Sequence, residues 1–309
     1  MYNFPIGVII NSFRTDIPTA VKKAAEVGAQ GIQVYATSGE MAPENLVGAK
    51  RKEFLDLVKS NGLTISALCG DLGGGGFSFK ERNPEKIEKS KRILDLAKEL
   101  ETNVVTTHIG VVPGDKNHDR YKVMQEACHE LAEYADSIDA HFAIETGPET
   151  SAVLKEFLDS LGSTGVGVNL DPANLVMVTG DNPVTAVHNL QKYIVHTHAK
   201  DGKQIFYKDP EIIYGMKQEV IVTEDSFIEV PLGEGSVPFK DYLNALTDIG
   251  YKGFLTIERE VGDNPEADIR KAVEFLQAIK KWERFARIKL LVNKINKFYH
   301  LKFIVNFEW

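Results

Sequence analysis

The sequence predicts an α/β fold: a single (β/α)8 TIM barrel with a long loop after the seventh strand and a C-terminal extension. Apolar, β-branched segments of strand length alternate with helical patterns along most of the 309 residues, as strand–helix units of a parallel sheet do. Polar residues that can bind metal follow several of the later strands. The length suits one barrel of about 250 residues plus an extension.

The predicted strands are short apolar runs bounded by turn residues. They cover residues 6–10, 31–35, 63–68, 104–107, 141–144, 166–170, 193–197 and 253–257. Apolar residues at helical spacing predict the helices between them. These cover residues 17–28, 43–61, 84–101, 119–138, 149–161, 183–190, 238–250 and 265–281. Gly28 is expected to end the first helix, and Asn83 to act as the N-cap of the third.

A doubly wound open sheet is the alternative, and it would place a ligand at one switch point of the strand order. Polar residues instead follow the predicted strands four to eight, which favours a closed barrel. Two segments break the regular alternation. Residues 201–235 form a long loop with an apolar run at 219–222, and such loops serve as lids or substrate walls. The barrel domain is expected to cover residues 1–282.

The remaining segment, 283–309, forms a basic and apolar extension with six Lys or Arg residues against two Glu. It is either a helix that packs on a partner chain or an incidental addition. The whole chain carries a net charge of −8, which argues against nucleic acid as a partner. Two cysteines exclude a disulfide framework. No signal peptide and no apolar run of about 18 residues is present, so we expect a cytoplasmic protein without a membrane partner.

Four segments each contain a residue that binds divalent metals at the end of a predicted strand. These residues are Glu145, Asp171, His198 and Glu258, spaced by 26, 27 and 60 residues. A single Glu at a strand end is usually a solvated loop residue, but one such position on each of four strands predicts a metal site at the barrel mouth. The residue types suit a hard or borderline cation such as manganese, cobalt or magnesium.

Side chains alternate along a strand, so His196 and His198 are both expected to face the barrel interior. His198 lies nearer the rim and is therefore the better ligand, whereas His196 is expected behind it or packed. His108 ends the fourth strand and is expected to bind a substrate hydroxyl. Lys200 is either an acid that contacts a substrate oxygen or a surface lysine at the start of a loop. Arg259 is expected to form a structural ion pair, because it points away from Glu258.

Five segments carry a family resemblance, and the last two of them in the following list are the most discriminating. They read IETG, NLDPAN, TIEREVGDNP, HTHAKD and VPLGEGSVPF. With them, residues 5 to about 281 resemble the xylose isomerase-like TIM-barrel superfamily, especially its sugar phosphate isomerase/epimerase branch, which includes ketose 3-epimerases and inosose dehydratase. The resemblance implies one divalent ion, Mn²⁺ first and Co²⁺, Mg²⁺ or Zn²⁺ otherwise. It implies Glu145, Asp171, His198 and Glu258 as the ligands.

The resemblance also implies a reaction. In the ketose 3-epimerases the two metal-bound glutamates, here Glu145 and Glu258, move a proton next to a carbonyl through a metal-stabilised enediolate. An isomerase or epimerase of a keto-sugar or polyol is therefore the first expectation. A dehydratase or lyase of an inosose or keto-sugar is the main alternative. Endonuclease IV-like DNA repair and non-catalytic sugar binding are remote alternatives.

Three positions depart from the 3-epimerases or favour the dehydratase branch. Asn174 stands where the 3-epimerases carry His, and Gln204 where they carry Arg. Lys200 with Asp201 resembles the inosose dehydratases. Glu234 lies in the PLGEG turn, which the family places near substrate. The expected substrate-binding residues are thus His108, Lys200, Asn174, Glu234 and His196, and relatives suggest a homo-oligomer, either a dimer or a tetramer.

Overall fold

The computed structural model describes residues 2–218 and 224–280. The predicted apolar run at 219–222 and the extension at 283–309 lie outside the described residues, as does the last residue of the predicted final helix. Within the described part, none of the helices is both long and apolar enough to cross a membrane.

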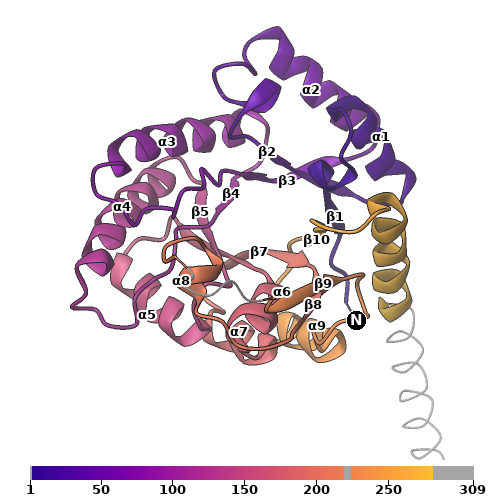
Figure 1. Cartoon of the computed structure of the whole chain (residues 1–309). Helices are drawn as coiled ribbons and strands as arrows, with labels where there is room; N and C mark the ends of the chain where they lie inside the picture. The colour runs from indigo at the N-terminus through magenta and orange to yellow at the C-terminus, as the bar shows by residue number, and fades with distance from the viewer. Residues whose placement is uncertain (1, 219–223, 281–309) are drawn as a thin grey trace, which may run out of the picture.

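Eight parallel strands close into a barrel in the order β1-β10-β7-β6-β5-β4-β3-β2, which confirms the predicted fold and excludes the open sheet. Helices surround the strands (Figure 1). The barrel strands are β1 (Ile6–Ile9), β2 (Gly31–Tyr35), β3 (Thr64–Cys69), β4 (Val104–Thr107), β5 (His141–Glu145), β6 (Val166–Leu170), β7 (Ile194–Ala199) and β10 (Leu255–Ile257).

The outer layer contains a helix after each strand. The long helices are α1 (Ile17–Glu26), α2 (Ala49–Ser60), α3 (Asn83–Glu99), α4 (Asp119–Ser137), α5 (Ser151–Leu161), α7 (Pro183–Asn189), α9 (Phe239–Asp248) and a final helix over residues 265–280. Short elements lie between them: the 3-10 turns Ile10–Phe13 and Gly39–Met41, α6 (Pro172–Asn174), the π-helical turn Leu175–Thr179 and α8 (Pro210–Ile213).

Two predicted helix starts are wrong and one predicted helix end is confirmed. Residues 43–48 form turns, and α2 begins only at Ala49. Asn83 is not an N-cap but the first residue of α3, because its side-chain amide donates to the Phe77 carbonyl oxygen (3.0 Å) instead of accepting from the helix. Gly28 follows α1 with a φ of 89°, the left-handed conformation in which glycine ends helices.

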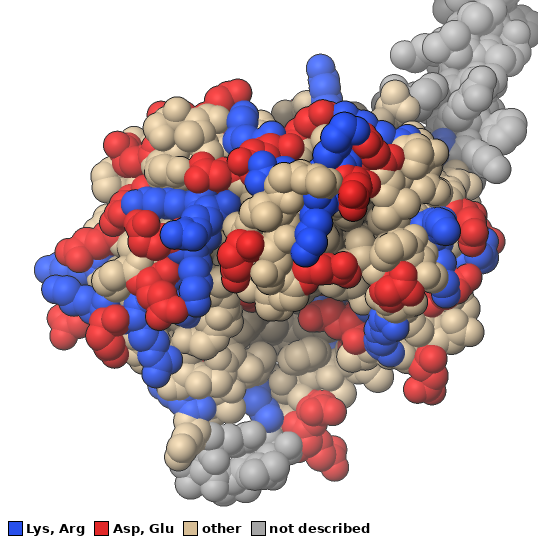
Figure 2. Space-filling view, turned by 90° about the horizontal axis from the view of Figure 1, so that it is seen from above, with Lys and Arg blue, Asp and Glu red and all other residues tan. Residues whose placement is uncertain are grey.

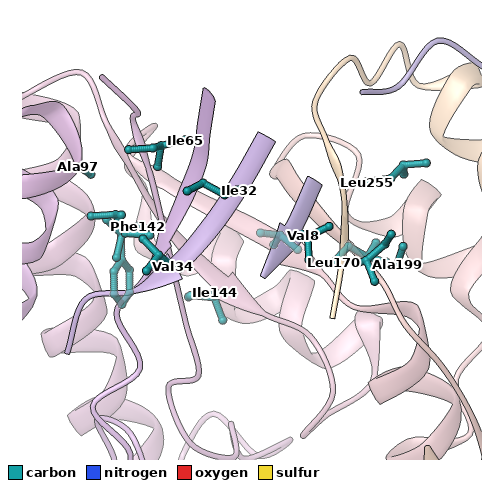
Figure 3. Close-up of a cluster of buried hydrophobic side chains, with 14 of the residues drawn as sticks. Val8, Ile32, Val34, Ile65, Ala97, Phe142, Ile144, Leu170, Ala199 and Leu255 are labelled. Carbon is teal, nitrogen blue, oxygen red and sulfur yellow. The ribbon is translucent and has the colours of Figure 1, made fainter. Parts of the chain in front are cut away.

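The strands sort their side chains onto two faces. Apolar residues point outward and pack under the helices: Figure 3 shows Ile32 and Val34 of β2 and Phe142 and Ile144 of β5 in this buried layer. The alternate residues point into the barrel, where Gln33 and others are polar and buried. Buried polar groups must be hydrogen-bonded, so the barrel interior holds a polar network that continues up to the mouth.

The long segment after β7 has secondary structure that the sequence did not predict. β8 (Asp201–Gln204) and β9 (Phe227–Val230) pair antiparallel in a two-stranded sheet. The four residues of β8 read DGKQ, which lacks the apolar alternation by which strands are recognised. This hairpin and α8 form a wall at the carboxyl ends of the barrel strands. On the face seen in Figure 2, Lys and Arg side chains are interspersed with Asp and Glu.

Candidate metal centre

Four buried side chains converge at the carboxyl ends of neighbouring strands. Glu145 ends β5, Asp171 follows β6, His198 lies in β7 and Glu258 follows β10. Each offers one ligand atom, and these atoms all lie within 4.8 Å of one another. The Nδ1 atom of His198 lies 3.5 Å from Glu145 Oε1, 3.3 Å from Asp171 Oδ2 and 3.3 Å from Glu258 Oε2. The sequence predicted this set of four.

Hydrogen-bond partners of Nε2 orient the His198 ring so that Nδ1 faces the carboxylates. Gln33 donates its side-chain amide to Thr106 Oγ1 (2.8 Å), which turns Gln33 Oε1 toward His198 Nε2 at 3.1 Å. Gln33 Oε1 can accept a hydrogen bond from an Nε2–H group, and the Asn169 side-chain amide nitrogen also lies 3.2 Å from Nε2. In the tautomer that donates to Gln33, the lone pair of neutral imidazole lies on Nδ1, toward the three carboxylates. Metal-binding histidines are oriented by such a bond from their second nitrogen.

The carboxylates are oriented in the same way. Asp171 Oδ1 accepts from the backbone N–H groups of Ala173 (2.8 Å) and Asn174 (2.9 Å), which leaves Oδ2 toward His198. Glu145 accepts from the side-chain amides of Asn169 at Oε2 (3.0 Å) and Asn174 at Oε1 (3.2 Å). Buried carboxylates are costly unless a cation pairs with them. Three oxygen donors and one imidazole thus fit a divalent cation that prefers oxygen or mixed ligands.

The charges at the centre also favour a bound cation. Burial opposes a charge on His198, but Glu258 and Glu145 outweigh it and raise its pKa well above the usual value. Lys200 is also buried, yet Glu258, Asp171 and Glu260 raise its pKa well above the usual value. Its Nζ lies 3.0 Å from Glu258 Oε2 and 3.8 Å from Glu229 Oε2, and it also pairs with Glu260. Lys200 is therefore no surface lysine.

We expect the Gln33→Ala substitution to lower the affinity for Mn²⁺ by about 10- to 100-fold, the usual effect of removing the partner of a ligating histidine. His198 would lose the acceptor that fixes its ring. Calorimetric titration of the chelator-treated protein with Mn²⁺ measures the change. Gln125→Ala is the matched control, because Gln125 is half-buried on α4, does not line the cavity and donates to the Ser160 carbonyl oxygen (3.4 Å). Unchanged affinity in Q33A would mean that Gln33 does not orient the ligand.

His108 lies beside this centre at the end of β4. Its Nδ1 is 3.3 Å from Asp71 Oδ2, and its Nε2 is 3.8 Å from Glu145 Oε1. Nε2 is buried and has no hydrogen-bond partner among the described residues. Burial lowers the pKa of His108, but the negative charges of Glu145 and Asp71 outweigh it and raise the pKa to about 9. The ring also lies against that of Tyr214, with centroids 5.6 Å apart.

One cavity of about 820 Å³ opens over the centre. Its lining includes the candidate metal ligands Glu145, His198 and Glu258 and three predicted substrate-binding residues, His108, Asn174 and Lys200. The other two predicted substrate-binding residues do not line it. His196 lies deeper in the barrel, where Asn169 Oδ1 and Thr256 Oγ1 bond its two ring nitrogens at 2.9 Å each. Glu234 is half-exposed and pairs with Lys271.

Asp201 explains why the HTHAKD and PLGEG segments occur together. Its carboxylate accepts from the backbone N–H groups of Gly202 (2.9 Å), Gly233 (3.0 Å), Gly235 (2.9 Å) and Val237 (3.1 Å). Any side chain at Gly235 would collide with Asp201, since a Cβ there would lie 1.9 Å from Oδ1. The PLGEG turn is therefore held in place at the base of the β8–β9 hairpin.

Two further positions, Gln204 and Arg259, have structural roles. Gln204 donates to the carbonyl oxygens of Met177 (3.2 Å) and Val178 (3.1 Å) and does not line the cavity, so this position ties the hairpin to the π-helical turn. Arg259 pairs with Glu229 (2.6 Å) and Asp268 (2.8 Å), which confirms its expected structural role.

The sequence reasoning missed several residues of the site. Gln33 and Asn169 are polar residues inside otherwise apolar strands, at inward-facing positions, and this signal could have identified them. Asp71 and Tyr214 lie in loops, and strand periodicity says nothing about where loop side chains point.

Glu149 is a buried carboxyl group near His108. Its Oε2 accepts from the Val112 N–H (3.1 Å), whereas Oε1 has no partner among the described residues. Burial raises its pKa to about 8. Because the folded-state value exceeds the unfolded one, the folded protein holds the proton more tightly. Its contribution to stability is thus complete below about pH 4.5 and is lost as the pH rises through about 8.

We therefore expect Glu149→Gln to remove a pH dependence. Relative to E149Q, the unaltered protein should lose more than about 1 kcal/mol of unfolding free energy between pH 5.5 and pH 8.5. Urea unfolding at three pH values measures this difference. Glu156→Gln is the control, because Glu156 lies in an exposed pair with Lys116. Parallel pH profiles for E149Q and the unaltered protein would show that Glu149 titrates normally.

Comparison with known proteins gives curated relatives with a named activity, inosose dehydratase, and several related structures. An inosose dehydratase from Lacticaseibacillus casei is 28% identical over 146 residues, 45% of this chain and 46% of the relative. The chain thus aligns with about half the length of that enzyme.

Among solved structures, a xylose isomerase domain protein from Planctomyces limnophilus has a TM-score of 0.74 at 24% identity, covering 90% of this chain and 97% of that one. A xylose isomerase-like TIM barrel protein from Mycobacterium smegmatis, in complex with magnesium, has a TM-score of 0.68 at 17% identity, covering 90% and 97%. The model of one family matches residues 21–279. The fold, the motifs and this match together show that the chain belongs to the xylose isomerase-like TIM barrel family.

Proposed function

We propose that the protein is a divalent-metal-dependent isomerase or epimerase of a keto-sugar or polyol, which moves a proton at the carbon next to a carbonyl. The convergence of Glu145, Asp171, His198 and Glu258 on one buried point carries this proposal. Two of the three carboxylates, Glu145 and Glu258, can also act as bases. Glu145 comes from β5 and Glu258 from the end of β10, and β6 and β7 lie between these two strands in the barrel.

Glu145, Asp171, His198 and Glu258 would hold the ion, with Mn²⁺ the first expectation and Mg²⁺, Co²⁺ or Zn²⁺ as alternatives. When bound, the ion supplies Lewis acidity, which makes a carbon-bound proton next to a carbonyl acidic enough for a carboxylate to remove. An oxygen-rich ligand set with a single histidine suits this group of metals.

The two glutamates perform the proton transfer. One carboxylate takes the proton from the carbon, and the other returns a proton to the opposite face, which inverts that centre. Asn169 and Asn174 hold Glu145 through their amides (3.0 and 3.2 Å), so its orientation is fixed before substrate enters. Lys200 holds Glu258 in the same way at 3.0 Å. Fixed orientation supports catalysis because the reacting groups need not reorganise.

His108 and Lys200 would bind the substrate oxygens. His108 Nε2 is a buried nitrogen that lines the cavity without a partner in the described part of the chain. A substrate hydroxyl or carbonyl oxygen would satisfy it. Lys200 reaches the cavity from the other side of the centre, where it neighbours Glu258. Asn174 lines the cavity between them and can accept or donate a hydrogen bond.

A dehydratase is the second candidate, and the burial of Lys200 beside Glu258 favours it. After one carboxylate removes the proton from carbon, the bond to a β-hydroxyl breaks. The hydroxyl then leaves as water with a proton donated by Lys200 or His108. The match to inosose dehydratase supports this alternative over part of the chain. We expect either reaction to take place in the cytoplasm and in a homo-oligomer.

Turnover in deuterated water separates the candidates. The Mn²⁺-loaded protein is incubated with a panel of ketoses and inososes. Solvent deuterium in an isomeric product, seen by NMR, supports isomerisation or epimerisation, whereas an ultraviolet-absorbing enone supports elimination. EDTA should abolish either reaction and Mn²⁺ should restore it. Sugar binding without any turnover would instead indicate a non-catalytic binding protein, and turnover that survives complete metal removal would refute the proposal.

A further inference from the structure

The cavity over the metal centre has two chemically distinct zones. The inner zone is polar and contains the metal-site residues together with His108, Asn174 and Lys200. Farther out lies an apolar zone, here called the outer wall. It consists of Met177, Val178, Ile213, Phe227, Ile228 and Val261.

The outer wall is assembled from four separate segments. Met177 and Val178 come from the π-helical turn, Ile213 from α8, Phe227 and Ile228 from β9, and Val261 from the loop after β10. Gln204 joins β8 to the π-helical turn, and Asp201 fixes the PLGEG turn that follows β9. The wall is therefore a built surface and not a chance exposure of one side chain.

Part of the outer wall is open to solvent. Ile228 is 50% exposed and Val261 is 48% exposed, and both line the cavity. Exposed apolar side chains that adjoin a polar site commonly mark a ligand-binding surface. A single sugar ring on the metal centre carries hydroxyl groups on most of its carbons. Such a ring is smaller than the drug-sized ligands that cavities of about 300–1,000 Å³ enclose, and this cavity is about 820 Å³.

We propose that the substrate is a glycoside: a keto-sugar whose ring lies over the metal centre and whose apolar, preferably aromatic, aglycone covers the outer wall. This inference rests on the proposed function above. The wall and the metal centre share one cavity, so a group attached to the reacting sugar can cover the wall while the ring lies over the centre.

The charges on the cavity lining favour an uncharged aglycone over a phosphate. Lys208 and Asp225 both line the cavity near the outer wall, and their charges offset each other. A phosphate subsite would need a net positive charge or a helix N-terminus directed at it. An aromatic group instead gains from contact with Ile, Val, Met and Phe side chains, which are the residues present.

Binding of matched glycosides tests the inference without any need for turnover. Methyl and phenyl β-D-glucopyranoside have no carbonyl and differ only in the aglycone. We expect the Mn²⁺-loaded protein to bind the phenyl glycoside about tenfold more tightly in a calorimetric titration. The double variant Ile228→Asn, Val261→Asn should reduce the ratio of the two affinities to near one.

Val47→Asn is the matched control, because Val47 is a 49% exposed valine that does not line the cavity, and the ratio should not change in it. Equal affinities for both glycosides in the unaltered protein would overturn the inference. The inference is also overturned if the double variant keeps the preference for the phenyl glycoside. It is overturned as well if the double variant changes only the oligomeric state in size-exclusion chromatography, because the wall would then form a contact between subunits.

The same pair of glycosides, oxidised to the 3-keto sugars, separates this inference from the proposed function. Deuterium exchange with both 3-keto glycosides at equal kcat/KM would leave the proposed function intact and refute the glycoside assignment. A phenyl preference in binding with no exchange in either 3-keto glycoside would leave the outer wall as an aglycone site and count against the proposed reaction on these sugars.

Discussion

Replacing either Glu145 or Glu258 by glutamine should lower kcat for the sugar reaction by at least about 10³-fold. General acid–base catalysis by one positioned group contributes about 10²–10⁴-fold, and each glutamate is also a proposed metal ligand. Glutamine keeps the size of the side chain but can neither accept the substrate proton nor carry the negative charge. Both positions are buried, so solvent cannot replace the missing carboxylate.

The measurement is deuterium exchange into the substrate, followed by NMR, together with a calorimetric titration with Mn²⁺. The two readouts separate proton transfer from metal binding. Glu156→Gln is the matched control, because this exposed glutamate on α5 pairs with Lys116 on the surface. The kcat of E156Q should stay within about twofold of that of the unaltered protein. If E145Q and E258Q both kept more than a tenth of the exchange rate, the glutamates would not be the acid and base.

The Asp201→Ala substitution should destabilise the protein by about 3 kcal/mol or more. Hydrogen bonds to a charged group each contribute about 1.5–3 kcal/mol, and Asp201 accepts four backbone N–H groups. Alanine leaves these donors without an acceptor at the base of the β8–β9 hairpin. The loss should also displace β9, which carries Glu229 and part of the outer wall.

Urea unfolding measures the effect, with Asp248→Ala as the control at an exposed position near the end of α9. Gly235→Ala provides an independent test of the same contact, since its Cβ would occupy the space of the Asp201 carboxylate. Stabilities of D201A and D248A that differ by less than about 1 kcal/mol would show that Asp201 does not hold the PLGEG turn.

The barrel and the grouping of four candidate metal ligands could be predicted because both follow from strand periodicity. Buried parallel strands read as apolar runs, and the inward-facing residue at the end of each run is set by the two-residue repeat. Glu145, Asp171, His198 and Glu258 stand at such positions, so the sequence alone was enough to group them. His196 shares the same parity, but parity does not give depth, and the structure places it below the cavity with both nitrogens bonded.

The wall of the site, unlike the barrel, could not be predicted from the sequence. It is made by α8, the β8–β9 hairpin and the π-helical turn, whose contacts join residues far apart in the chain, as Gln204 joins Met177. Loop segments lack a repeating pattern, and their side chains are directed by long-range hydrogen bonds such as those of Asp201. For the same reason Glu234 was expected near substrate on its motif alone, whereas its side chain pairs with Lys271 outside the cavity.

The central claim is that one divalent ion binds where four strand-end residues meet. Anomalous diffraction from a crystal grown with Mn²⁺, recorded near the manganese absorption edge, tests it directly. We predict one strong peak within about 2–2.5 Å of Glu145, Asp171, Glu258 and the Nδ1 atom of His198, the usual range of metal–ligand distances. The absence of a peak at this point, or a peak bound by other residues, would contradict the claim.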